Sequence, residues 1–218
     1  MLPMFGQSWT VFAPEPINGD YHFNVRATVE NKDGVEVETD WVSANEVELS
    51  MVINNLFPPR AGIQAEELAS SYMSSWYDLN AAQHEVVADD FLKSEWQLAL
   101  TNDLEATVVD ETSTEEGAEQ GPEVVENYLY REQQATAYAT QVAKAIWGNK
   151  VEKVQFRASR QNVVPFGQRN NPDAVRPDPT VVLPGWREPS VSDGQDEEAF
   201  ARVFQRNYER LTGETVQR

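Results

Sequence analysis

Few residues in this chain are suited to metal or nucleophilic chemistry. There are only two histidines, His22 and His84, and cysteine is absent. The stretch from His84 resembles a zinc-protease helix, but alanine stands at position 88, where that helix needs its second histidine. The lack of cysteine excludes disulfides, thiolate metal sites, iron–sulfur clusters and a cysteine nucleophile. We therefore predict no metal site and interpret both histidines as surface residues.

Adjacent carboxylates are the remaining candidates for catalysis. They occur at Asp89-Asp90, Asp110-Glu111, Glu115-Glu116 and Glu197-Glu198. Glycoside hydrolysis needs two carboxylates across a sugar-binding cleft, but neighbouring acids arise readily in a chain with 36 acidic residues. The last pair is explained by the preference of acidic side chains for the first turn of a helix. We assign no catalytic residue, and a carboxylate-dependent hydrolase or sugar-binding enzyme is the alternative function.

Sequence motifs for ligands are also missing. The alternating oxygen ligands of a calcium loop do not occur, and the segment 31–34 is too short for one. Phosphate loops, dinucleotide fingerprints and the Gly-x-Ser-x-Gly elbow are absent too. We predict no cofactor. A calcium-stabilised structural module stays open as a third interpretation, since carboxylates are the metal ligands that this chain has in abundance.

The net charge of −19 restricts the class of partner. It repels a phosphate backbone, so we predict no nucleic-acid binding, and an anionic membrane surface is disfavoured for the same reason. Residues 1–130 contain 25 acidic and 4 basic side chains, while residues 131–218 contain 11 acidic and 13 basic ones. This asymmetry predicts electrical polarity in the folded molecule. No run of 18 apolar residues and no signal-peptide pattern occur, so we predict no transmembrane segment in this chain.

The N-terminal segment is the most distinctive part of the sequence. Residues 7–16 read Gln-Ser-Trp-Thr-Val-Phe-Ala-Pro-Glu-Pro, and breakers at this spacing disfavour a helix. Two interpretations are open: residues 1–19 form an extended arm that seals the core, or they dock to a partner or to a membrane-embedded segment. In the second case the interaction residues are Gln7, Trp9, Phe12, Pro14 and Pro16.

The same segment resembles the Q-x-W-x-x-F-A-P-x-P signature of an actinobacterial family of unknown function. Weaker similarities lie at residues 23–27, 56–60 and 154–157, the last leading to Val164-Pro165. Members of that family usually carry one membrane helix just before the signature, which this sequence lacks. A similar segment lies outside the helical bundle of some vitamin-K-carboxylase-like membrane proteins. The resemblance implies a domain beside a membrane and supplies no catalytic residues.

The elements that would position such a surface begin with a β-hairpin at residues 21–42. Apolar and polar residues alternate on both sides of the turn sequence Asn31-Lys32-Asp33-Gly34. A bulge at the glycine would make Val29 face Val37, and it would make Val25 face Trp41.

Charged side chains on the sheet should also pair across strands. With the same bulge, Arg26 would face Asp40 on the opposite face of the hairpin. A third strand at 151–160 alternates in the same way, and we expect its Lys153 and Arg157 near the strand that contains Glu36 and Glu38. The charges would then help to assemble the sheet.

Helical patterns fill most of the remaining chain. Ser43 to Glu46 form a capping box that opens a helix, and a second helix begins near Gln64, with a pattern that continues through Val87, Phe91 and Trp96. A long helix follows Pro122 and ends at Gly148-Asn149.

We predict a single α+β domain over residues 1–218. A small antiparallel sheet, made from the hairpin 21–42 and the strand 151–160, packs against three to four helices. Residues 103–120 form an acidic loop, residues 162–190 a proline-rich extended segment, and residues 193–212 a C-terminal helix. The predicted function is a non-catalytic interaction or structural domain on the extracytoplasmic side of a membrane, with a protein partner there. The sequence identifies no small-molecule ligand.

Overall fold

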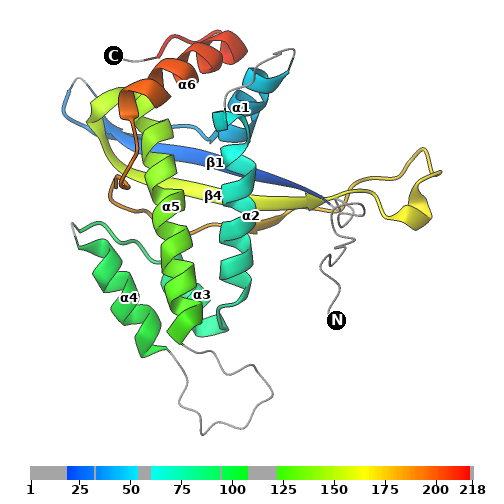
Figure 1. Ribbon diagram of the computed structural model, residues 1–218, viewed down its shortest axis with the longest axis horizontal. Coiled ribbons are helices and arrows are strands. Elements are labelled where there is room, and N and C mark those ends of the chain that lie inside the picture. The colour runs from blue at the N-terminus through cyan, green and yellow to red at the C-terminus, as the bar shows by residue number, and fades with distance from the viewer. Residues whose placement is uncertain (1–18, 32, 54–59, 94, 108–121, 217–218) are drawn as a thin grey trace, which may run out of the picture.

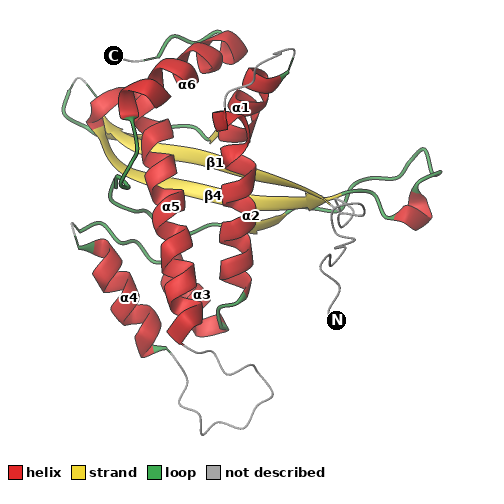
Figure 2. Cartoon of the chain, in the orientation of Figure 1, coloured by secondary structure: helices red, strands yellow, loops and turns green. Residues whose placement is uncertain are grey.

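The computed structural model describes residues 19–31, 33–53, 60–93, 95–107 and 122–216 (Figure 1). The proposed interaction residues in the N-terminal segment and the greater part of the acidic loop, residues 108–120, lie outside these ranges. The remaining residues form an α+β fold with an antiparallel sheet and six α-helices in the described part of the chain (Figure 2). The predicted fold class is therefore confirmed.

Two long antiparallel strands form the centre of the sheet. β1 (Gly19–Glu30) pairs along its length with β4 (Val151–Asn162). Short strands extend both edges: β2 (Glu36–Glu38) and β3 (Val42–Ser43) pair with β1, and β5 (Thr180–Val182) pairs with β4. The strand order is β2-β1-β4-β5, with β3 also on β1.

Six α-helices are described, and the first, second and fifth of them pack against the long strands of this sheet. They are α1 (Ala44–Val52), α2 (Gln64–Tyr77), α3 (Ala81–Ala88), α4 (Trp96–Ala106), α5 (Pro122–Trp147) and α6 (Glu197–Thr212). α2 and α5 run side by side across β1 and β4 (Figure 1). Short 3₁₀ turns occur at Arg60–Ile63, Gly148–Lys150 and Phe166–Gln168.

The core forms because alternate strand residues point toward α2 and α5. Phe23 and Val25 of β1 and Phe156 of β4 are fully buried. The Phe23 ring stacks on Phe156 with 5.1 Å between ring centres, and Tyr72 of α2 meets Phe156 edge-on at 4.9 Å. Aromatic packing thus joins the sheet to the helices in a chain without disulfides.

The hairpin register is confirmed near the turn and wrong further away. Gly34 has a φ of 75°, the amide of Asn31 donates to the carbonyl of Val35, and Val29 stands opposite Val37 as predicted. Beyond that pair, however, Val25 stands opposite Val42 and not Trp41.

The shift arises at Thr39, which faces Ala27 in an irregular way. The amide of Thr39 donates to the carbonyl of Ala27, and the amide of Ala27 donates to Oγ1 of Thr39. A side-chain oxygen therefore takes the place of a ladder carbonyl, and one extra residue is accommodated as in a bulge. The expected pairing of Arg26 with Asp40 is wrong for the same reason, since Arg26 forms its ion pair with Glu38 at 3.0 Å.

The helical pattern after Gln64 is divided where the sequence suggested continuity. α2 ends at Tyr77, and Asn80 begins α3 with a capping box in which its side chain accepts from the amide of Gln83. Residues 103–106, which were expected in the acidic loop, belong to α4. The C-terminal helix begins at Glu197, behind an Asp196 N-cap, and not at residue 193.

Other element boundaries agree with the sequence. Ser43 caps α1 through the amide of Glu46, and Gly148 with a φ of 79° follows the end of α5. Within the segment 162–190, the structure adds the edge strand β5 and the 3₁₀ turn at Phe166. None of the described helices has both the length and the apolar character needed to cross a bilayer.

Candidate functional site

The sheet face that points away from α2 and α5 holds a continuous stack of cations and aromatic rings. Cζ of Arg26 lies 4.8 Å from the ring centre of Trp41 and 4.7 Å from that of Trp186. Cζ of Arg157 lies 4.9 Å from the ring centre of Trp41. Nζ of Lys153 lies 5.8 Å from the ring centre of Trp186. We call these five residues the cation–aromatic ladder. Each contact of this kind contributes about 0.5–1 kcal/mol at exposed sites.

The ladder follows from strand alternation and from the hairpin bulge. Arg26 on β1 and Gln155 on β4 are register partners on this outer face, and Nε of Arg26 donates to Oε1 of Gln155 at 2.8 Å. Because the extra residue at the bulge places Val42 opposite Val25, Trp41 is free to join the outer face beside Arg26. The register shift therefore places Trp41, one of the two aromatic rings of the ladder, on the outer face.

Two of the three cations of the ladder are neutralised at the strand edge. Arg26 pairs with Glu38 at 3.0 Å. Lys153 pairs with Glu36 at 3.3 Å, as expected from the sequence. Their side chains stay about a quarter exposed, at 25% and 27%. Arg157 takes part in no ion pair within the described ranges, and its Nε is buried without a hydrogen-bond partner there. One end of the ladder thus carries uncompensated positive charge.

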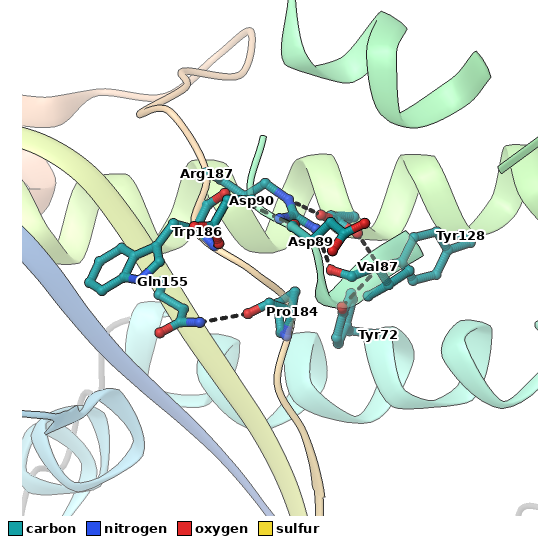
Figure 3. Close-up of polar contacts among 10 residues, drawn as sticks. Tyr72, Val87, Asp89, Asp90, Tyr128, Gln155, Pro184, Trp186 and Arg187 are labelled. Atoms are coloured by element: carbon teal, nitrogen blue, oxygen red, sulfur yellow. Dashed lines mark hydrogen bonds and ion pairs between the residues drawn. The ribbon is translucent and has the colours of Figure 1, made fainter. Parts of the chain in front are cut away.

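Trp186 reaches the ladder because its backbone is pinned beside β4. The neighbouring Arg187 exchanges both backbone hydrogen bonds with Val154, each 2.9 Å long, and the carbonyl of Pro184 accepts from Nε2 of Gln155 at 2.7 Å. On its other side, the amide of Phe91 donates to the carbonyl of Trp186 at 2.9 Å. In this extended segment, consecutive side chains point to opposite faces, as Figure 3 shows for Trp186 and Arg187.

The guanidinium of Arg187 is the buried anchor of this segment. Nε of Arg187 donates to Oε1 of Glu132 on α5 at 2.5 Å, and both side chains are 0% exposed. Nη2 donates to the carbonyl of Val87 at 2.8 Å, and Nη1 donates to the carbonyl of Asp89 at 2.7 Å (Figure 3). Burial opposes the charge of Arg187, but Glu132, together with Tyr128 and Tyr72, outweighs this effect, and the pKa of Arg187 is raised.

Two tyrosines complete the buried network. The hydroxyl of Tyr128, one turn before Glu132 on α5, donates to Oε2 of Glu132. The hydroxyl of Tyr72 then donates to that of Tyr128 at 3.0 Å. Burial, reinforced by the charge of Glu132, holds the pKa of both tyrosines well above their usual range, so both stay protonated. Each oxygen of the carboxylate accepts one hydrogen bond, and the network of Glu132, Arg187 and the tyrosines fixes helices α2, α3 and α5 to the segment of Trp186.

A family model of unknown function matches residues 1–189. The chain belongs to this family, described as "Family of unknown function (DUF5819)". The matched span contains β1 to β5 and every residue of the ladder and of the Arg187 network, and it ends before α6 (Glu197–Thr212). No curated protein and no solved structure matches the chain.

The family region contains a second buried carboxylate, Glu48 on α1, which is 2% exposed. Its Oε1 accepts from the hydroxyl of Tyr138 at 2.5 Å, and its Oε2 accepts from the amide of Ala65 at 2.8 Å. Burial raises the pKa of Glu48 to about 7, although these hydrogen bonds act in the opposite direction. Its hydrogen-bond partners are the hydroxyl of Tyr138 and backbone amides. The facing second carboxylate that hydrolysis requires is missing among its described neighbours.

Two of the carboxylates and one of the histidines singled out from the sequence have structural partners. Oδ1 of Asp90 accepts from the amide of Trp186 at 2.8 Å, and Glu197 in the first turn of α6 pairs with Lys144 at 2.7 Å. His84 stacks on Trp76 with 3.6 Å between ring centres, and its Nε2 lies 2.8 Å from the Trp76 carbonyl. Asp110, Glu111, Glu115 and Glu116 lie outside the described residues. Within those residues, no group of three or more potential ligands could hold a metal ion.

Sequence reasoning missed the residues that organise this site. Glu132 stands four residues after Tyr128, a spacing that places both on one helix face, but it resembles any acid in an acidic chain. Arg187 lies between prolines in Pro184-Gly185-Trp186-Arg187-Glu188-Pro189, where it gives no periodic signal. Trp41 was expected on the core face, and only the bulge at Thr39 reveals its true position.

Proposed function

We propose that this domain is a non-catalytic interaction domain on the extracytoplasmic side of a membrane, and that the cation–aromatic ladder binds its protein partner. The observation that carries the proposal is the contrast between the two faces of the sheet. On the helix side, the carboxylates of Glu48 and Glu132 are buried and accept hydrogen bonds from within the protein. On the outer side, the side chains of Arg26 and Lys153 remain about a quarter exposed and Trp41 is half-buried, whereas Trp186 beneath them is buried.

The ladder fits a partner that presents carboxylates. The guanidinium of Arg157 lies over the Trp41 ring and is oriented in advance, so that less side-chain entropy is lost when it binds a carboxylate. Arg157 is the residue best placed for this contact, because no ion pair within the described ranges compensates its charge. The rest of this acidic chain repels an acidic partner, and repulsion of that kind restricts docking to the ladder.

Copurification from native membranes tests this function. Tagged full-length chain is extracted with mild detergent beside two variants with the same charge change, Arg157→Glu in the ladder and Arg202→Glu on the exposed surface of α6. We expect a defined partner with the native chain and with Arg202→Glu, and its loss with Arg157→Glu. A chain that is monomeric and without a partner in such extracts would contradict the proposal.

We further propose the N-terminal residues Gln7, Trp9, Phe12, Pro14 and Pro16 as a second contact with the same membrane assembly. Support comes from their aromatic–proline composition and from the family match, which begins at residue 1. Trp9→Ala should then weaken copurification and leave the melting temperature near that of the native chain. A loss of about 3–5 kcal/mol in unfolding free energy would instead identify Trp9 as a core residue.

A further inference from the structure

The outer face of the sheet continues from the cation–aromatic ladder onto β5, where it becomes apolar. Ser159 of β4 stands opposite Val181, and Ala158 stands opposite Val182. Val182 is buried in the core, whereas Val181 and Leu183 on either side of it are exposed, at 46% and 45%. Strand alternation therefore places Val181 and Leu183 on the same face as the ladder.

Leu183 follows the strand register beside Arg157. Because β4 and β5 are antiparallel, these two residues are the next positions across the two chains after the last paired residues. The chain stays beside β4 at this point, since the carbonyl of Pro184 accepts from Nε2 of Gln155 at 2.7 Å. Arg157 therefore has apolar neighbours on both sides: the half-buried ring of Trp41 from the β1 side and Leu183 from the β5 side.

The charges of the ladder leave room for one carboxylate at this place. Glu38 and Glu36 neutralise Arg26 and Lys153, while Arg157 takes part in no ion pair within the described ranges. The side chains of Glu36 and Glu38 are themselves more than half exposed, at 60% and 58%. They repel further acidic groups that approach the ladder. One carboxylate is thus attracted to Arg157, and additional carboxylates are disfavoured.

We propose that the partner binds through a segment that presents one acidic side chain beside a large apolar side chain. The carboxylate pairs with Arg157, and the apolar side chain packs on Leu183 and Val181. The diagonal between Arg157 and Val181 across the two strands is about 7 Å, which is also the distance between residues two apart in an extended peptide. The inference rests on the proposed function, because it names the chemistry of the segment that binds at the ladder.

A partner with only one of the two features fits this surface less well. A purely acidic segment meets the repulsion of Glu36 and Glu38 and leaves Val181 and Leu183 uncovered. A purely apolar segment covers the guanidinium of Arg157 without supplying an acceptor, and a charge that is buried without a partner is costly. Only the combination of both features uses the whole surface.

Selection from a phage-displayed library of random peptides on the full-length chain tests this chemistry. We expect the enriched peptides to contain Asp or Glu with a large apolar residue two positions away, and we expect no enrichment of them on Arg157→Glu. Enriched peptides that contain several acids and no apolar residue, or apolar residues and no acid, would overturn the inference.

A selected peptide then allows the apolar contact to be measured by fluorescence anisotropy. Val181→Ser with Leu183→Ser should weaken its binding about tenfold. Val37→Ser on β2 removes a side chain of the same 45% exposure and should bind like the native chain. Serine in place of the apolar residue of the peptide should weaken binding to a similar degree, which tests the contact without any change to the protein. Binding that is insensitive to these changes would contradict the contact.

The outcomes separate this inference from the proposed function. If the library yields no enriched peptide, while native membranes yield a partner that depends on Arg157, the inference fails and the proposed function stands. If peptides of the expected type bind, but no protein copurifies from native membranes, the chemistry of the surface is supported and the proposed membrane function fails.

Discussion

The carboxylate of Glu132 and the guanidinium of Arg187 form an ion pair that is fully closed to solvent, with 2.5 Å between Oε1 and Nε. Fifty-five residues separate them in the sequence. The pair joins the longest helix to the segment that places Trp186 on the opposite face of the sheet. A bond in the core thereby determines the geometry of the proposed binding surface.

Removal of one partner of this pair should be strongly destabilising. Arg187→Met leaves the charge of Glu132 buried without compensation, and we expect a loss of about 3–5 kcal/mol in the free energy of unfolding, measured in urea. Arg176→Met, which breaks an ion pair at a half-exposed site, is the control and should cost about 1 kcal/mol or less. Equal effects of the two substitutions would show that the buried pair is not an anchor.

Replacement of both partners should separate charge from packing. In Arg187→Met with Glu132→Leu no charge remains buried, so part of the stability lost in Arg187→Met should return. The recovery is incomplete because the carbonyls of Val87 and Asp89 lose their donors. A double variant as unstable as the sum of the two single variants would contradict the electrostatic account.

Glu48 should make stability depend on pH near neutrality. Its pKa is about 7 in the folded protein, above the value of 4.5 of an unperturbed glutamate, so the folded state binds the proton more tightly than the unfolded state. The stabilisation that protonated Glu48 contributes to the folded state is fully present below pH 4.5 and is lost as the pH rises through 7. The total change is on the order of 3 kcal/mol. Glu48→Gln should remove this slope in urea unfolding between pH 5 and pH 8, and an unchanged slope would refute the assignment.

The backbone beside Trp186 should tolerate no side chain at Gly185. A Cβ there would stand 2.1 Å from the carbonyl oxygen of Asp89 and 2.4 Å from its carbonyl carbon, and backbone atoms do not yield easily. We expect Gly185→Ala to cost about 1–3 kcal/mol in thermal unfolding and to disturb the Trp186 environment. Gly167→Ala, where the added Cβ has open space, should melt like the native chain.

The sequence predicted local structure well where one physical signal dominated. Alternation identified β1 and β4, and the Pro122 start with the Gly148 end bounded α5. The break between α2 and α3 was not predicted, because the apolar stripe continues across Asn80. The capping box that starts α3 at Asn80 opposes this continuous pattern only through local hydrogen bonds. Such short-range competition is hard to weigh without the fold.

The candidate site was less predictable, since its parts come from distant segments. Lys153 and Glu36 were expected to approach each other, because charge alternation on two strands is visible in the sequence. The position of Trp41 on the outer face depends on one extra residue at Thr39. The position of Trp186 depends on the ion pair between Glu132 and Arg187. Tertiary contacts of this kind leave no periodic pattern along the chain.

Site-directed photo-crosslinking on native membranes tests the central claim most directly. A photoreactive residue replaces Asn24, which stands opposite Arg157 on the outer face, or Arg202 on α6 as the control. We predict a defined crosslinked protein from position 24, its absence from position 202, and its loss when Arg157→Glu is combined with the position 24 probe. Equal crosslinking from both positions, or a product that persists with Arg157→Glu, would contradict a partner bound at the cation–aromatic ladder.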